Sequence, residues 1–209
     1  MNRTNAEQAY QIIKSRIIRT ELNPGAVINE SELMDDLGLG RTPIREALNR
    51  LQSDDLVVVK PRRGIFVAEL AITDLSQIFE VRVELESLAV KLACQRITED
   101  KLKRLGKLAN QHLYSSTISK EDLIEMDSKF HALVRKATHN RFLISNLEYY
   151  YNLSLRIWHL VLPRATAEEI DVKAHFKIYQ AIAAKDEDLA VKRISKHIRD
   201  FHKTIKNYL

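Results

Sequence analysis

The chain has 209 residues, 45% of them hydrophobic, which is enough for one large domain or two smaller ones with a real core. The net charge of +5 does not by itself indicate nucleic acid as a partner, because residues 1–70 hold ten Lys or Arg against ten Asp or Glu. A single cysteine, Cys94, excludes an internal disulfide framework. No apolar run approaches the roughly 18 to 20 residues that span a bilayer. We therefore expect a soluble, cytoplasmic protein without membrane contact.

The first predicted helix covers residues 5–21, where apolar residues recur at helical spacing, and the turn Asn23-Pro24-Gly25 ends it. A second predicted helix starts near Asn29 and carries a short apolar face. It ends at Gly38, because glycine tolerates the left-handed conformation of a helix C-cap. We expect the first helix to pack behind the two helices of the stretch that begins at Asn29.

A third predicted helix begins three or four residues after Gly38. Thr42 can cap it, and Pro43 suits its first helical position. Two helices separated by so short a turn must cross, which predicts a helix-turn-helix whose second helix can enter the major groove of DNA. The apolar stripe of that second helix is Ile44, Ala47, Leu48 and Leu51.

The side chains predicted to point outward from this helix are of types that bond phosphates and guanine edges. A solvated amphipathic helix explains the same pattern, because charged helix faces are usually only hydrated. The outward residues are Arg41, Thr42, Arg45, Asn49 and Arg50.

The segment that follows favours DNA binding. Two β-rich runs, residues 56–59 and 65–68, flank a basic tip bounded by Pro and Gly, which predicts a two-stranded wing. Arg62 and Arg63 would give a second cationic contact, and Gly64 would let the backbone approach the phosphates.

Over nearly all of residues 5–69 the sequence resembles the winged-helix domain of the GntR family of bacterial transcription regulators. The resemblance implies that Arg41 and Arg45 contact DNA, with Thr42 and Pro43 at the helix start and Gly64 at the wing tip. The matching residues are Gly25, Asn29-Glu30, Leu33, Leu37, Gly38, Arg41-Thr42-Pro43-Ile44-Arg45-Glu46-Ala47-Leu48, Leu51, Leu56-Val57 and Gly64-Ile65-Phe66-Val67.

Two positions depart from the family pattern. Gly40 stands where the family usually has Ser or Thr, so a hydroxyl contact to phosphate is missing. Asp54-Asp55 stands where the family has an acidic residue followed by glycine, so the turn before the wing must form without glycine.

The rest of the chain is predicted to be all α. We expect a winged helix-turn-helix domain over residues 1–69, a linker over 70–72 and an antiparallel six-helix bundle over 73–209, so that the fold is mainly α. The predicted bundle helices cover about 73–96, 99–115, 119–138, 140–162, 166–184 and 186–207, with breaks that include His139-Asn140 and Lys185-Asp186.

Four side chains of the bundle form a candidate metal site. Asp127 and His131 lie one turn apart on a helix face that should be apolar, and His175 and His197 lie on the apolar faces of the last two helices. If the chain reverses near Asp186, both histidines are eleven residues from the turn and therefore at the same height. Each histidine alone is more simply a core residue, but together they predict a divalent metal, most simply Zn, with Ni, Mn or Fe as alternatives.

Arg82 and Glu86 form a second buried pair one helical turn apart. They can bridge two buried faces, bind an acidic ligand, or do both. Residues 73–205 resemble the FCD effector-binding domain of the FadR subfamily of GntR regulators, and six helices rather than seven place the chain near the shorter VanR-like group. The resemblance implies a metal that helps to hold small carboxylate effectors, and its matching residues are Arg82, Glu86, Asp127, Phe130, His131, His175 and His197.

The sequence thus predicts a homodimeric, ligand-responsive transcription regulator, most simply a repressor, that binds a palindromic operator. Two alternatives stay open at this point. A metal-dependent hydrolase would use the metal to activate water, although no spare carboxylate stands at motif spacing to act as a base. A regulator with a purely structural metal would bind DNA without a small-acid effector.

Overall fold

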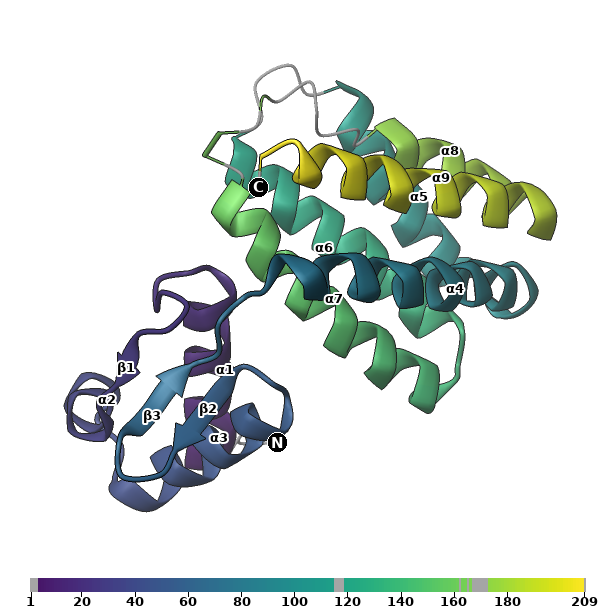
Figure 1. Ribbon diagram of the computed structural model, residues 1–209. Helices are drawn as coiled ribbons and strands as arrows, with labels where there is room; N and C mark the ends of the chain where they lie inside the picture. Colours follow the sequence, from purple (N-terminus) through teal and green to yellow (C-terminus); the bar gives the residue numbers. More distant parts are fainter. Residues whose placement is uncertain (1–3, 115–118, 162, 165, 167–172, 209) are drawn as a thin grey trace. The chain divides into compact units, whose positions relative to one another are not determined.

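The computed structural model describes residues 4–114, 119–161, 163–164, 166 and 173–208 (Figure 1). The chain forms two compact units. The first contains the residues up to Ala71 together with Leu155–Leu160, and the second contains Ile72–Ser154 and Val161–Leu209. Among the helices described, none is long and apolar enough to cross a membrane.

The first unit is a helix-turn-helix followed by a β-hairpin. Its helices are α1 (Asn5–Ile18), α2 (Glu30–Leu37) and α3 (Arg41–Ser53), and its strands are β1 (Val27–Ile28), β2 (Val57–Lys60) and β3 (Gly64–Val67). The strands form an antiparallel sheet in the order β1-β3-β2, with Phe66 opposite Val58 on one side and Val27 on the other. The hairpin was predicted. The pairing of β1 with β3 was not, because two residues are too few to show a strand pattern.

Apolar stripes join α1 to α3. Ile13, Ile17 and Ile44 have no exposed surface, and this contact places α1 behind the helix-turn-helix as predicted. Burying such side chains stabilises the unit by roughly 1.5 to 3 kcal/mol each. The helix α1 ends three residues earlier than predicted, at Ile18, where Thr20 turns the chain with a positive φ of 58°.

The ends of α2 and α3 show how the turn is made. Gly38 closes α2 in the left-handed conformation, with φ 63°, as predicted. The prediction that Thr42 caps α3 is wrong: Gly40 is the N-cap, no side chain caps the helix, and Pro43 lies in its first turn. The turn before the wing forms without glycine because Asp55 takes a left-handed φ of 55°.

In the part of the chain that the structure describes, the second unit contains the six predicted helices. They are α4 (Ile72–Arg96), α5 (Glu99–Tyr114), α6 (Lys120–Ala137), α7 (Arg141–Val161, of which Leu155–Leu160 belong to the first unit), α8 (Lys173–Ala183) and α9 (Glu187–Lys206). Figure 1 shows α8 and α9 side by side, and α4 packs along α9 and against α6. The start of the predicted fifth helix falls partly on residues 167–172, which lie outside the described residues.

Two described breaks between helices fall at the predicted positions, whereas the predicted break at residues 115–119 lies mostly outside the described residues. His139 and Lys185 take left-handed φ values of 51° and 55°, which end α6 and α8. Asp186 then caps α9 by accepting a hydrogen bond from the Leu189 amide at 3.0 Å. Cys94 is buried in α4, and burial raises the pKa of its thiol to about 11, so it behaves as a small apolar side chain.

Candidate functional site

Helix α6 brings two ionisable side chains into the core. Asp127 and His131 lie one turn apart, and both are buried, with 6% and 1% of their surface exposed. Phe130 stacks on His175 of α8 with a ring separation of 4.4 Å, which fixes the plane of that imidazole. The helix therefore places a carboxylate and an imidazole where an apolar residue would be expected.

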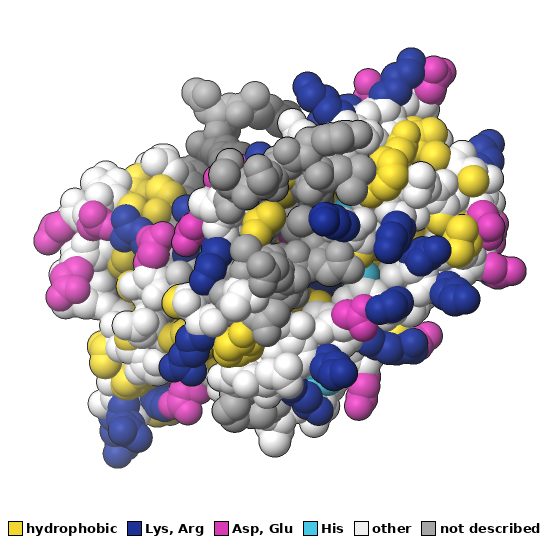
Figure 2. All heavy atoms as spheres, turned by 90° about the horizontal axis from the view of Figure 1, so that it is seen from above, with side chains coloured by type: hydrophobic (Ala, Val, Ile, Leu, Met, Phe, Trp, Pro, Cys, Tyr) yellow, Lys and Arg dark blue, Asp and Glu magenta, His cyan; other side chains and the backbone are white. Residues whose placement is uncertain are grey.

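The hairpin of α8 and α9 brings the other two imidazoles to the same height. His175 has no exposed surface, and its ring centroid lies 4.7 Å from that of His197. On the face drawn in Figure 2, Lys and Arg side chains stand at the surface, whereas only small parts of His side chains are visible. The equal spacing of both histidines from Asp186 thus had the geometric consequence predicted.

One carboxylate oxygen faces all three imidazoles. Asp127 Oδ1 lies 3.1 Å from His175 Nε2, 3.6 Å from His131 Nε2 and 3.8 Å from His197 Nε2. The four donor atoms lie within 4.8 Å of one another. Three imidazole nitrogens and one carboxylate oxygen, each from a separate side chain, are a donor set that fits a divalent transition metal.

The protonation states also suit a metal. Burial lowers the pKa of His175 to about 3, so this ring is neutral at pH 7 and can donate a lone pair. Burial alone would raise the pKa of Asp127, but the charge of His131 and hydrogen bonds from His175 and His197 hold that pKa well below its ordinary value. Asp127 is therefore an anion.

Two further side chains orient the donors. His131 Nδ1 lies 3.3 Å from Glu86 Oε1 without hydrogen-bond geometry, and its Nε2 is on the side of Asp127. The hydroxyl of Tyr151 donates to Asp127 Oδ2 at 2.6 Å, which leaves Oδ1 toward the histidines. Such outer partners fix the tautomer and direction of metal ligands.

The predicted pair of Arg82 and Glu86 is present and buried. Arg82 Nη2 lies 3.5 Å from Glu86 Oε1, and the two side chains are 4% and 0% exposed. Burial opposes the ionisation of Glu86, but the charges of His131, Arg82 and Arg135 bring its pKa down to about 2. Glu86 thus serves both the arginine and the metal-site histidine.

Tyr151 and Arg135 were not predicted as part of the site. A tyrosine in an aromatic run shows no polar partner in sequence. Arg135 is buried on α6, one turn beyond His131 in the series Asp127, His131, Arg135. That four-residue spacing was the available signal.

The predicted DNA-contact residues of α3 stand at the surface of the first unit. Arg41, Thr42, Arg45, Asn49 and Arg50 are exposed, and Pro43 is half-buried. Arg45 is 67% exposed and lies 3.8 Å from Glu30 of α2, a distance at which an exposed pair contributes little. Its guanidinium remains available to another anion.

Arg50 differs from the other arginines of α3 because α1 holds it. Its Nη1 donates to Glu7 Oε2 at 2.6 Å, and its guanidinium lies 3.9 Å from the ring centroid of Tyr10. The hydrogen bond with Glu7 raises the pKa of Arg50. Arg50 therefore joins α3 to α1, whatever else it contacts.

The wing tip presents its charges outward. Arg62, Arg63 and Gly64 are exposed, and Lys60 Nζ lies 4.9 Å from the ring centroid of Phe66. Arg62 and Gly64 take positive φ values of 62° and 112°, so the tip depends on left-handed backbone at two positions. Glycine adopts such values without strain, so Gly64 suits its position at the tip.

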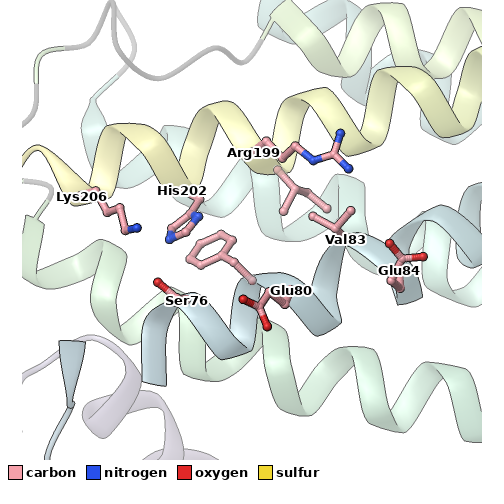
Figure 3. Close-up of a pocket in the computed structure, with 9 residues that line it drawn as sticks. Ser76, Glu80, Val83, Glu84, Arg199, His202 and Lys206 are labelled. Atoms are coloured by element: carbon pink, nitrogen blue, oxygen red, sulfur yellow. The ribbon is translucent and has the colours of Figure 1, made fainter. Parts of the chain in front are cut away.

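Among the side chains that the structure describes, no other histidine belongs to the metal-donor cluster. His202 stacks on Phe79 at 4.6 Å and lines a separate hollow of about 500 Å³ between α4 and α9 (Figure 3). Figure 3 shows Glu80, Glu84, Arg199 and Lys206 at its edge, and none of the four converging donors lines it. The side chain of His112 lies outside the described residues.

Both units of the chain match known protein families. Residues 5–67 match the model of the family described as bacterial regulatory proteins, gntR family, and residues 77–200 match the FCD domain. The HTH-type transcriptional regulator YdhC of Bacillus subtilis (strain 168) is 29% identical over 97% of this chain and 91% of its own length. The Nta operon transcriptional regulator of Aminobacter aminovorans is 30% identical over 84% of this chain and 82% of its own.

Solved structures show the same fold. Escherichia coli McbR/YncC superposes with a TM-score of 0.86 at 22% identity and covers 99% of both chains. A GntR regulator from Rhodococcus sp. RHA1 gives 0.78 at 20% identity and covers 98% of both. The two family matches lie on the helix-turn-helix with the exposed arginines of α3 and on the helices that gather the metal donors. The chain therefore belongs to the GntR family, as a DNA-binding transcription regulator that carries an FCD domain.

Proposed function

We propose that this regulator is a repressor that binds a palindromic operator as a homodimer and leaves it when a small organic acid binds beside a metal in the FCD domain. The proposed metal and acid sites rest on one observation: Asp127 Oδ1 faces three histidine nitrogens in a core that also holds the buried Arg82. The ligand would act by its different affinity for the DNA-competent and DNA-incompetent states.

The proposed metal is a divalent ion held by Asp127, His131, His175 and His197. Zinc suits nitrogen and carboxylate donors most simply, and Ni, Mn or Fe fit the same set. A bound ion would act as a Lewis acid toward a ligand oxygen. Arg82 supplies a buried cation for the acid, and Glu86 holds both Arg82 and His131 in place.

The proposed homodimer is supported by an apolar stripe on α4. Residues with a seven-residue repeat run along its outer side, as at a helix–helix seam. Val81 and Leu88 remain 37% and 43% exposed, which is unusual for large apolar side chains on one stripe. The stripe consists of Ile78, Val81, Leu85, Leu88 and Leu92.

The proposed DNA contacts come from α3 and the wing. The exposed cations of α3 would enter the major groove, and the wing tip would contact the backbone. We also propose that the DNA-binding domain ends at residue 69, with residues 70–72 as a linker to the effector domain, and that the protein acts in the cytoplasm. The proposed contacts are Arg41, Thr42, Pro43, Arg45, Asn49, Arg50, Arg62, Arg63 and Gly64.

Gel retardation with DNA from the protein's own promoter region tests the regulator. Arg45→Ala should weaken specific binding by roughly 5- to 150-fold, which corresponds to about 1 to 3 kcal/mol for one base-contacting arginine. The matched control is Lys103→Ala, which removes one exposed charge from α5 and should leave binding unchanged. Equal retardation by wild type and Arg45→Ala would contradict the proposed contact face.

The remaining alternative is a purely structural metal. Retardation should be repeated with metal-loaded protein in the presence of small organic acids. An acid that weakens DNA binding supports the effector site. If every acid leaves DNA affinity unchanged while the metal stays bound, the structural alternative holds instead. The hydrolase alternative is set aside because the family and the named relatives are transcriptional regulators.

A further inference from the structure

Two buried guanidinium groups lie beside the candidate metal site. Arg82 on α4 is 3% exposed and Arg135 on α6 is 7% exposed. In the described part of the chain, the atoms of this site that are buried without a hydrogen-bond partner include Arg82 Nε, Arg135 Nη1, Glu86 Oε2 and His131 Nδ1. The two guanidinium nitrogens are donors, and unpartnered charged donors are costly in a protein core, so they point to a missing acceptor.

Tyr151 connects both guanidinium groups to the metal donors. The Cζ atoms of Arg82 and Arg135 lie 5.2 Å and 4.8 Å from its ring centroid. Its hydroxyl donates to Asp127 at 2.6 Å. The aromatic face attracts both cations, but it carries no net charge that could neutralise them. The two arginines and the four donors therefore form one continuous polar site.

The charges of this site do not balance once a metal is present. Among the described residues, Glu86 and Asp127 are the only buried carboxylates. Asp127 faces the three imidazoles, and Glu86 is shared between Arg82 and His131. Two guanidinium groups and a divalent ion, set against two carboxylates and neutral histidines, leave an excess of two positive charges in a buried site.

We propose that the effector is a small dianion, of which an α,ω-dicarboxylate is the simplest example. The inference rests on the proposed acid-binding site and specifies the class of acid. One acidic group would bind at the metal held by the four donors, and the second would pair with the guanidinium groups of Arg135 and Arg82. A monocarboxylate would leave one buried guanidinium without a counter-charge, which is why the site favours the dianion.

Matched ligands test the charge without changing the protein. Metal-loaded full-length protein should be titrated calorimetrically with malonate, succinate, glutarate and adipate, and with the monomethyl ester of each acid. Each pair has nearly the same size and differs by one charge. We expect at least one dicarboxylate to bind ten or more times more tightly than its own ester.

Arg135 variants test the residue. Arg135→Gln should weaken the preferred dicarboxylate at least tenfold and change the affinity of its monomethyl ester less than twofold. Arg135→Lys keeps the charge and should retain part of the preference. The matched control is Lys136→Gln, because Lys136 is the exposed neighbour on the same helix. Metal content and thermal unfolding are measured for each variant.

The outcomes separate the two proposals. If esters and diacids bind equally well, the dianion inference is wrong and the proposed acid site stands. If neither form of any chain length binds at millimolar concentration, the dianion inference and the proposed acid site both fail. If diacids are preferred equally by wild type and by folded Arg135→Gln, the assignment of the second charge to Arg135 is wrong.

Discussion

The helix-turn-helix with its wing and the core of the second unit use charge in opposite ways. In the helix-turn-helix and wing, Arg41, Arg45, Arg62 and Arg63 are exposed to solvent, where a charged side chain costs little. In the second unit, Arg82, Glu86 and Asp127 lie in the core, where each needs a partner inside the protein. Substitutions in the first unit should therefore change DNA affinity with little effect on stability, whereas substitutions in the second should change ligand binding and stability together.

The largest effect is expected from Asp127→Asn. This change removes the one charged donor while keeping the side-chain shape, so bound metal should fall from one ion per chain to none at micromolar metal. With wild type at about a hundred times its metal Kd, the lost stabilisation is about 3 kcal/mol, or roughly 5 to 10 °C in Tm. Metal analysis and thermal unfolding, with and without a chelator, measure both.

The matched control for Asp127→Asn is Glu125→Gln. Glu125 is an exposed carboxylate on the same helix, paired only at the surface with Lys129. It should keep full metal content and a Tm close to that of wild type. Metal retained at one ion per chain by Asp127→Asn would show that the four donors do not form the metal site.

The burial of His175 predicts how the stability of the metal-free protein changes with pH. The pKa of His175 is lowered to about 3 by burial, whereas the unfolded chain takes up this proton near 6.5. Stability is therefore fully present above pH 6.5 and falls as the pH drops, by roughly 1 to 2 kcal/mol between pH 7 and pH 5. The lowered pKa values of Glu86 and Asp127 contribute only at lower pH.

Urea unfolding of chelator-treated protein at both pH values measures this slope. His175→Gln removes the titrating group and should flatten the dependence between pH 7 and pH 5. An equal slope in wild type and variant would show that His175 does not control acid stability.

Arg50 sharpens the comparison within the first unit, because it is the arginine of α3 that is tied to the fold by Glu7 and Tyr10. The side chain is 49% exposed, so solvent screens this pair, and Arg50→Ala should cost only about 0.5 to 1 kcal/mol of unfolding free energy. Arg45→Ala should leave stability unchanged within about 0.5 kcal/mol. Denaturation should therefore show the larger loss of stability for Arg50→Ala, whereas gel retardation should show the larger loss of DNA affinity for Arg45→Ala.

The smallest effect is expected from Gly40→Ser. The N-cap of α3 has no side-chain hydrogen bond, its backbone is extended, and a Cβ would meet no atom within 4 Å. A serine hydroxyl can cap the helix and stabilise it by a few tenths of a kcal/mol. It can also reach a phosphate, so operator affinity should rise slightly. A serine variant with weaker DNA binding would contradict this placement of Gly40.

The sequence alone determined most of the helices, the hairpin and the height at which His175 and His197 lie. Helix rise is fixed by backbone geometry, so equal spacing of His175 and His197 from Asp186 was enough to place them level. The end of α2 at Gly38 was also determined locally, since glycine readily takes the left-handed conformation that ends a helix. These features need no knowledge of distant contacts.

The tertiary structure alone decided which polar side chains share a site. Tyr151 meets Asp127 across α7 and α6, Arg50 meets Glu7 across α3 and α1, and β1 exists through pairing with β3. Each depends on the approach of segments far apart in the chain, and residue spacing within one helix carries no information about the neighbour it will face. Arg135 depends on both sequence and packing. Its four-residue spacing from His131 puts it on the same face of α6. The packing of α4, α6 and α7 puts it against the Tyr151 ring and leaves its Nη1 without a hydrogen-bond partner.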